Sequence, residues 1–116
     1  MLDINNNMNG NGKDSGTLRV SLLPLLELVQ ERLPPTLPIR LRVSRLKGAF
    51  GSCDIRNTNR DGKHFLISIC SGISEESAKE TLLHEYAHVL AWELSEDDHG
   101  AEWGYQYSRI YRAVCE

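Results

Sequence analysis

The sequence predicts an α+β domain in which a small three-stranded sheet packs against three helices. Leucines at helical spacing over residues 17–33, and an apolar segment that begins after Ser74, predict two of these helices. Apolar and polar residues alternate over residues 39–43 and 65–69, which predicts strands with one buried face. A chain of 116 residues has room for one such domain.

The N-terminal part divides into a leader and a helix. Residues 1–16, MLDINNNMNGNGKDSG, contain few large apolar side chains, so we expect a disordered leader there and a single domain over residues 17–116. The apolar face of the helix is formed by Leu18, Leu22, Leu25, Leu26 and Val29. Because proline is disruptive beyond a first helical turn, Pro24 predicts either a helix start near Ser21 or a kink.

Three strands and two helices are predicted in the rest of the chain. Residues 50–55 are a candidate second strand, and the Asn-Arg-Asp-Gly segment at 59–62 predicts the turn of a hairpin. Ser74, followed by two glutamates, is a typical N-cap, and its helix is expected to reach about Leu94. The last helix has an apolar stripe that we expect to join the core, made of Trp103, Tyr107, Ile110, Tyr111 and Val114.

The composition of the chain indicates which partners it can bind and in which cellular compartment it is expected. The net charge of −3 gives no general attraction to nucleic-acid phosphates. The one basic run, Arg40, Arg42, Arg45 and Lys47, is better explained as the solvated face of a strand. Three widely spaced cysteines indicate neither a disulfide framework nor a cysteine zinc site. With no apolar segment of membrane-spanning length, we expect a cytoplasmic protein that makes no membrane contact.

Residues 84–88 read HEYAH, which is the HExxH pattern, and they fall inside the predicted helix after Ser74. Positions four apart lie on one helical face, so His84 and His88 can bind a single Zn²⁺ ion. Glu85 points to a neighbouring part of that face, where it can reach a water on the metal. It is the candidate general base.

A catalytic zinc site needs a third protein ligand. The metzincin pattern would require glycine and histidine where this chain has Ala91 and Leu94. A thermolysin-like spacing would select Tyr107, and Glu102 comes too early in the sequence. His99 follows a short acidic turn and directly precedes the last helix, so a reversal of the chain can bring it to the metal as the third ligand.

HEYAH together with HGAEW at 99–103 resembles the SprT-like family, which includes the Spartan proteases. GAFGSC at 48–53, HFLISIC at 64–70 and ETLLHEYAH at 80–88 extend the resemblance. It implies a minimal zincin fold, zinc held by His84, His88 and His99, a Glu85 base, and cleavage of protein substrates, often proteins crosslinked to DNA. Because nothing after Tyr111 could form a cysteine-rich zinc ribbon, we expect at most a weak or indirect association with DNA.

Several alternatives remain at this stage. A non-catalytic zinc-binding module, or inactive zincin, is the main alternative function, and retention of Glu85 argues against it. A three-histidine endoribonuclease is disfavoured, because such sites need no Glu beside the first histidine. Either Tyr105 or Tyr107 could assist catalysis, and His64, in the polar alternation of a strand, is assigned to structure or to solvent exposure. If the strand at 65–70 lies at a sheet edge, an extended substrate could pair with it.

Overall fold

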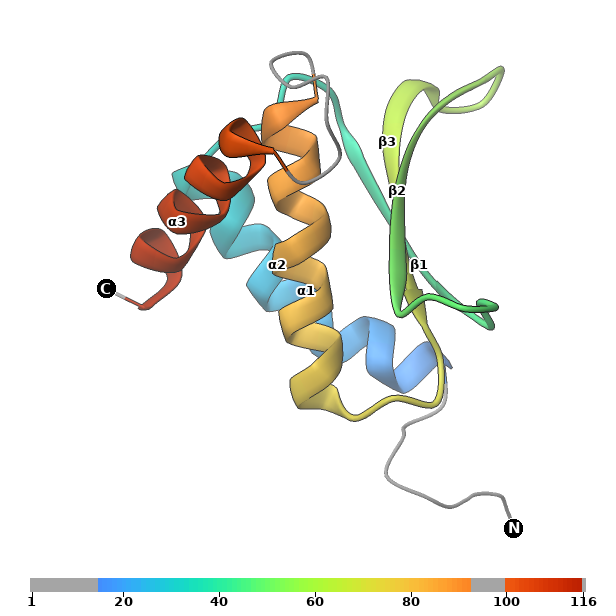
Figure 1. The fold of residues 1–116 in the computed structure, drawn as a ribbon. Helices are drawn as coiled ribbons and strands as arrows, with labels where there is room; N and C mark the ends of the chain where they lie inside the picture. Colours follow the sequence, from blue (N-terminus) through green and yellow to red (C-terminus); the bar gives the residue numbers. More distant parts are fainter. Residues whose placement is uncertain (1–14, 93–99, 116) are drawn as a thin grey trace, which may run out of the picture.

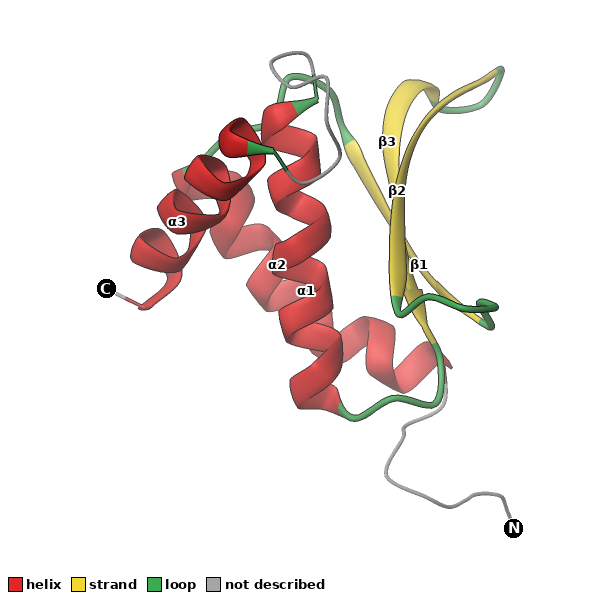
Figure 2. Ribbon diagram, in the orientation of Figure 1, coloured by secondary structure: helices red, strands yellow, loops and turns green. Residues whose placement is uncertain are grey.

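The computed structural model describes residues 15–92 and 100–115 and has the α+β architecture that the sequence predicts. Its helices are α1 (Ser15–Arg32), α2 (Glu75–Ala91) and α3 (Ala101–Cys115), and its strands are β1 (Ile39–Ser44), β2 (Gly51–Thr58) and β3 (Gly62–Cys70). The helices lie on one side of the sheet, with α2 between the sheet and α3 (Figures 1 and 2). This arrangement is that of a minimal zincin-like fold.

α1 is longer than the sequence suggested. It begins at Ser15, within the expected leader, and continues through Pro24 instead of starting near Ser21. Pro24 lies on the exposed side of the helix, where water can bond the carbonyl that proline leaves without an N–H partner. The opposite face, with Leu18, Leu22 and Val29, is almost fully buried. The rest of the leader, residues 1–14, lies outside the described residues.

The sheet order is β1-β3-β2, so β3 is the central strand. β1 pairs with it in parallel, and β2 pairs with it antiparallel through the predicted hairpin. Gly62 has a φ of 68° at the end of the turn, a conformation that glycine adopts without strain. Residues 65–70 are therefore paired on both sides, and the hypothesis that a substrate pairs with this strand at a sheet edge is wrong. Among the described residues, the unpaired edge on the hairpin side belongs to β2.

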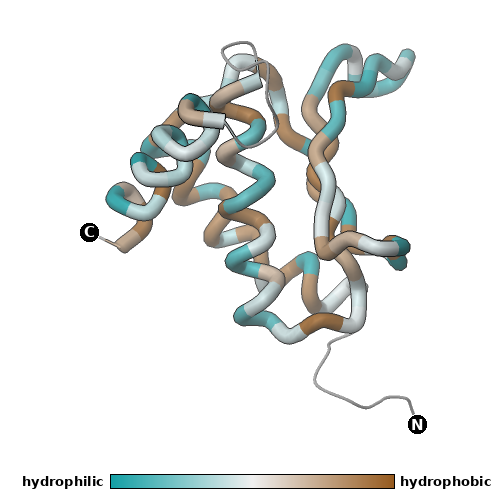
Figure 3. The backbone as a smooth tube through the Cα atoms, viewed as in Figure 1, coloured by the Kyte–Doolittle hydropathy of each residue, from teal (hydrophilic) through white to brown (hydrophobic). Residues whose placement is uncertain are grey.

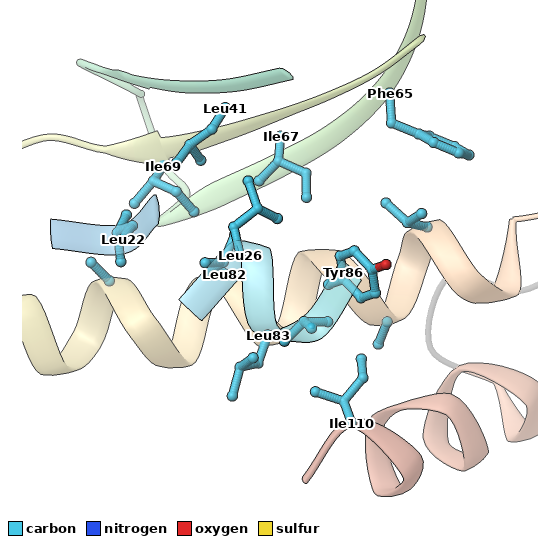
Figure 4. Packing of buried hydrophobic residues seen from close by; sticks show 14 of the residues in the cluster. Leu22, Leu26, Leu41, Phe65, Ile67, Ile69, Leu82, Leu83, Tyr86 and Ile110 are labelled. Carbon is cyan, nitrogen blue, oxygen red and sulfur yellow. The ribbon is translucent and has the colours of Figure 1, made fainter. Parts of the chain in front are cut away.

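The core lies between the sheet and the helices. Figure 4 shows Ile67 and Ile69 pointing from β3 toward the helices, while Ile110 reaches the core from the other side of α2. The predicted stripe of α3 packs against this cluster as expected. In Figure 3 the tip of the β2–β3 hairpin is hydrophilic, in keeping with its exposure. The hydrophobic packing fixes α2 against the sheet along its length.

Candidate active site

The middle of α2 carries His84, Glu85 and His88. The helix starts as predicted, because the Ser74 hydroxyl accepts a bond of 3.1 Å from the backbone N–H of Ser77. It ends at Ala91, a little earlier than the expected Leu94. One turn of helix separates the two histidines, whose ring centres lie 5.2 Å apart. Both rings are half-buried, whereas Glu85 is only 6% exposed.

The start of β2 lies directly against this part of α2, and Gly51 makes the approach possible. A Cβ atom at Gly51 would lie 2.5 Å from Cγ2 of Thr81, which is closer than real carbon contacts, and 3.2 Å from Cγ of Glu85, which is a tight contact. Only glycine therefore lets β2 pass over the Glu85 side chain at this distance. The GAFGSC segment at 48–53 contributes to the family resemblance, but nothing in the sequence indicates that Gly51 lies against α2.

Two cavities of about 320 and 340 Å³ open beside the HEYAH residues. Both are lined by Gly51, His84 and Glu85, so they form the two sides of one site. The first extends to Phe50, Glu80, Thr81 and Tyr107, and the second to Ser52, Cys53, His88 and Trp92. An extended chain that crossed the site could place side chains in both cavities.

Trp103 of α3 packs against both imidazoles. Its ring centre lies 4.9 Å from that of His84 and 5.7 Å from that of His88. Its indole N–H donates to the backbone carbonyl of His84 over 3.3 Å. The sequence correctly placed Trp103 in the apolar stripe but did not reveal these contacts, which fix the first turn of α3 beside the histidines.

The two tyrosines that the sequence left open have different environments. Tyr105 is 60% exposed, with the Arg109 guanidinium 6.0 Å from its ring centre, and it lines neither cavity. Tyr107 lines the first cavity, and its ring centre lies 6.1 Å from that of His84. Of these two side chains, only Tyr107 lines one of the two cavities.

Cys53 faces the second cavity as a neutral thiol. Burial raises the pKa of Cys53 to about 12, and the negative charges of Glu85 and Asp54 act in the same direction. Glu85 lines the same cavity as Cys53, so its side chain lies close to the first residues of β2. Sequence reasoning gave Cys53 no place at the site, and an isolated cysteine offers no signal that could have found it.

The chain has two further histidines, His64 and His99. His64 is buried in β3, and its Nδ1 atom lies 2.9 Å from the carbonyl oxygen of Gly62, which fits its predicted structural role. His99 falls within residues 93–99, outside the described residues. Over residues 15–92 and 100–115, no three His, Cys, Asp or Glu side chains form a metal-binding group. The described chain resumes at Gly100, next to the helix that carries Trp103.

The basic run of β1 faces solvent. Arg40 and Arg42 are exposed, while Leu41 between them is buried. Arg40 forms an ion pair with Asp61 over 3.0 Å, so part of this positive charge is balanced.

None of the helices in the described part of the chain combines the length and apolar character needed to cross a bilayer.

Comparison with known proteins gives one match. The family model described as the SprT-like family matches residues 23–115, which covers most of the chain and includes α2, α3 and the whole sheet. No curated protein and no solved structure matches the chain.

Proposed function

Because the chain belongs to the SprT-like family, we propose that it is a zinc-dependent endopeptidase in which His84, His88 and His99 bind the metal. The separation of 5.2 Å between the His84 and His88 ring centres is the main support. Zinc binds imidazole nitrogen at roughly 2.0–2.1 Å, so two tetrahedral ligands have ring centres about 5 Å apart. The two side chains on α2 therefore fit one Zn²⁺ ion.

The position of α3 supports His99 as the third ligand. Trp103 contacts both imidazoles, and its N–H bonds to the carbonyl of His84. The first turn of α3 is thereby held beside the two histidines, and residue 99 precedes that turn by two positions. The donor set would then be three neutral imidazoles, which is a common set for catalytic zinc.

Glu85 has the position expected of a general base. Bound zinc lowers the pKa of a water ligand toward about 7 and polarises the carbonyl group of a substrate. Glu85, which lines both cavities, accepts a proton as the water oxygen bonds to the carbonyl carbon. It returns that proton to the amide nitrogen as the C–N bond breaks, so a peptide is cleaved into an acid and an amine.

The free edge of β2 is the proposed binding site for the substrate backbone. Within the described residues β2 pairs only with β3, and its first residues, Gly51 to Cys53, line the cavities beside Glu85. An extended peptide that pairs with this edge would pass the general base. The substrate class is therefore an unfolded or extended protein segment. Exposed Phe50 lines the first cavity and exposed Trp92 lines the second, so each can contact an apolar side chain of the substrate.

DNA is not needed for this binding mode. The ion pair between Arg40 and Asp61 balances part of the positive charge on that part of the sheet, and the net charge of the chain is −3. We therefore propose that proteins are bound directly, and that any action on DNA-associated or DNA-crosslinked proteins arises through an indirect or weak contact with DNA.

The test is hydrolysis of an unfolded protein by the wild type and by Glu85→Gln, with zinc content measured in both. The amide keeps the size of the side chain but cannot accept the proton, so turnover should fall at least about 1,000-fold while one zinc per chain is retained. Zinc binding without turnover in the wild type would favour the non-catalytic zinc module. Equal rates for the two proteins would disprove the base mechanism, and cleavage of RNA would favour the endoribonuclease.

A further inference from the structure

The first cavity contains few groups that could stabilise negative charge on a substrate. Its described polar lining is Glu80, Thr81, His84, Glu85 and Tyr107. Carboxylates accept hydrogen bonds, and His84 is a proposed metal ligand. The Thr81 hydroxyl already donates to the carbonyl oxygen of Ser77 over 2.7 Å. Tyr107 is therefore the neutral donor of this lining that can turn toward a substrate.

The Tyr107 ring is held from several sides. Its centre lies 4.9 Å from that of Trp103 and 5.0 Å from that of Tyr111, in addition to its contact with His84. A donor held in position before the reaction stabilises developing charge with little reorganisation. The aromatic packing therefore meets a requirement for transition-state stabilisation.

The Tyr107 hydroxyl has two neighbouring partners, the Glu80 carboxylate and the Tyr111 hydroxyl. It lies 3.4 Å from Oε2 of Glu80, near the upper limit for an O–H donor. The Tyr111 hydroxyl donates to the same oxygen and lies closer to it. Since Tyr111 satisfies this oxygen, the long bond from Tyr107 to Glu80 can be exchanged for a bond to a substrate oxygen. Tyr107 can still accept a hydrogen bond from a neighbouring hydroxyl while its own O–H donates to the substrate.

We infer that the Tyr107 hydroxyl donates a hydrogen bond to the scissile carbonyl oxygen as that oxygen gains negative charge. This inference rests on the proposed peptidase function and adds a catalytic residue to it. Tyr107 keeps its proton throughout, because the only proton that moves is the one carried by Glu85. Tyr111 and Glu80 are positioning residues, which act by holding the neighbouring ring and acceptor.

The experiment compares Tyr107→Phe with Tyr105→Phe, a matched loss of one hydroxyl two residues away on the exposed side of α3. For Tyr107→Phe we expect kcat for a peptide to fall about 100-fold with KM within about twofold of wild type. Tyr105→Phe should leave both constants unchanged. A constant KM is required because the bond forms only in the transition state.

A binding measurement gives a readout independent of turnover. A phosphinic peptide mimics the tetrahedral, negatively charged carbon, and calorimetry should show about 100-fold weaker binding to Tyr107→Phe than to wild type. The calorimetric stoichiometry also gives the fraction of folded protein, so loss of fold is not mistaken for loss of kcat. Tyr105→Phe should bind the phosphinic peptide as the wild type does.

The outcomes separate this inference from the function on which it rests. If Glu85→Gln abolishes turnover but Tyr107→Phe keeps wild-type kcat and inhibitor affinity, Tyr107 is not catalytic and the peptidase assignment stands. A rise in KM alone would make Tyr107 part of the binding surface and would overturn the inference. Absence of turnover in the wild type would overturn both.

Discussion

The indole N–H of Trp103 bonds to the backbone carbonyl of His84, so a residue of α3 is tied to the residue of α2 that begins the HEYAH motif. The indole ring also packs on His84 and His88. Mutation of a side chain that holds a metal ligand in place typically lowers metal affinity by about 10- to 100-fold. Trp103 therefore links the packing of α3 to the geometry of the proposed metal site.

Replacing Trp103 with Phe should keep much of the ring packing but remove the bond to His84. We expect the free energy of unfolding to fall by about 1–2 kcal/mol, from the lost hydrogen bond and the smaller ring. Zinc affinity should fall about tenfold. Urea unfolding and competition with a zinc chelator measure the two effects. Unchanged zinc affinity would show that Trp103 only stabilises the fold.

Replacing His99 with Ala should abolish tight zinc binding, because two imidazoles alone make an incomplete site. His64→Gln is the matched control, since His64 is buried in β3 and lines neither cavity. Metal analysis after dialysis should show about one zinc per chain in the control and much less in His99→Ala. Full zinc content in His99→Ala would exclude residue 99 as a ligand.

Replacing Gly51 with Ala should push β2 away from α2, because the new methyl group would meet Thr81 and Glu85. We expect a loss of about 1–3 kcal/mol in stability and a lower kcat, since Glu85 is one of the displaced groups. Adding Thr81→Ser removes the nearest methyl group and should restore part of the stability.

Gly104→Ala is the control for the same change. A Cβ atom at Gly104 would meet nothing within 4 Å, and the residue lies inside α3. Alanine there should stabilise the protein by up to about 1 kcal/mol. Thermal unfolding separates the two variants, and equal destabilisation would contradict the close approach at Gly51.

The Cys53 thiol should react slowly with a maleimide, and its ionisation should lower the free energy of unfolding at high pH. In metal-free protein at pH 8, a maleimide should modify exposed Cys115 well before Cys53, whose pKa of about 12 leaves almost no thiolate. The folded protein holds the Cys53 proton up to a pH of about 12, whereas the unfolded chain releases it near pH 9. The free energy of unfolding is therefore unaffected by this thiol below about pH 9 and falls as the pH rises toward 12. Cys53→Ala should remove that part of the alkaline loss. Equal labelling of the two thiols would show that Cys53 is accessible.

Much of the fold follows from local patterns. Apolar spacing located the three helices, alternation located β1 and β3, and the Ser74 N-cap fixed the start of α2. These features are predictable because each depends on neighbouring residues alone. The extent of α1 was not predictable in this way, because the exposure of Pro24 depends on which face of the helix the core covers.

The arrangement of the site required the tertiary structure. The HExxH spacing predicts that His84 and His88 share a face, but no local pattern shows that β3 is central or that Gly51 passes over Glu85. The choice between Tyr105 and Tyr107 likewise depends on the rotation of α3 about its axis, which Ile110 and the other buried side chains determine. Long-range packing, not composition, decides these points.

The order β1-β3-β2 leaves an edge of β2 unpaired among the described residues, and such an edge favours self-association. An unpaired strand edge can template a strand from another copy of the same chain, and charged side chains normally discourage this. On β2 the charges come at Asp54 and Arg56, after an uncharged stretch from Gly51 to Cys53. The stretch that would admit a substrate is thus also the least protected against self-association, so specific activity should decline as enzyme concentration rises.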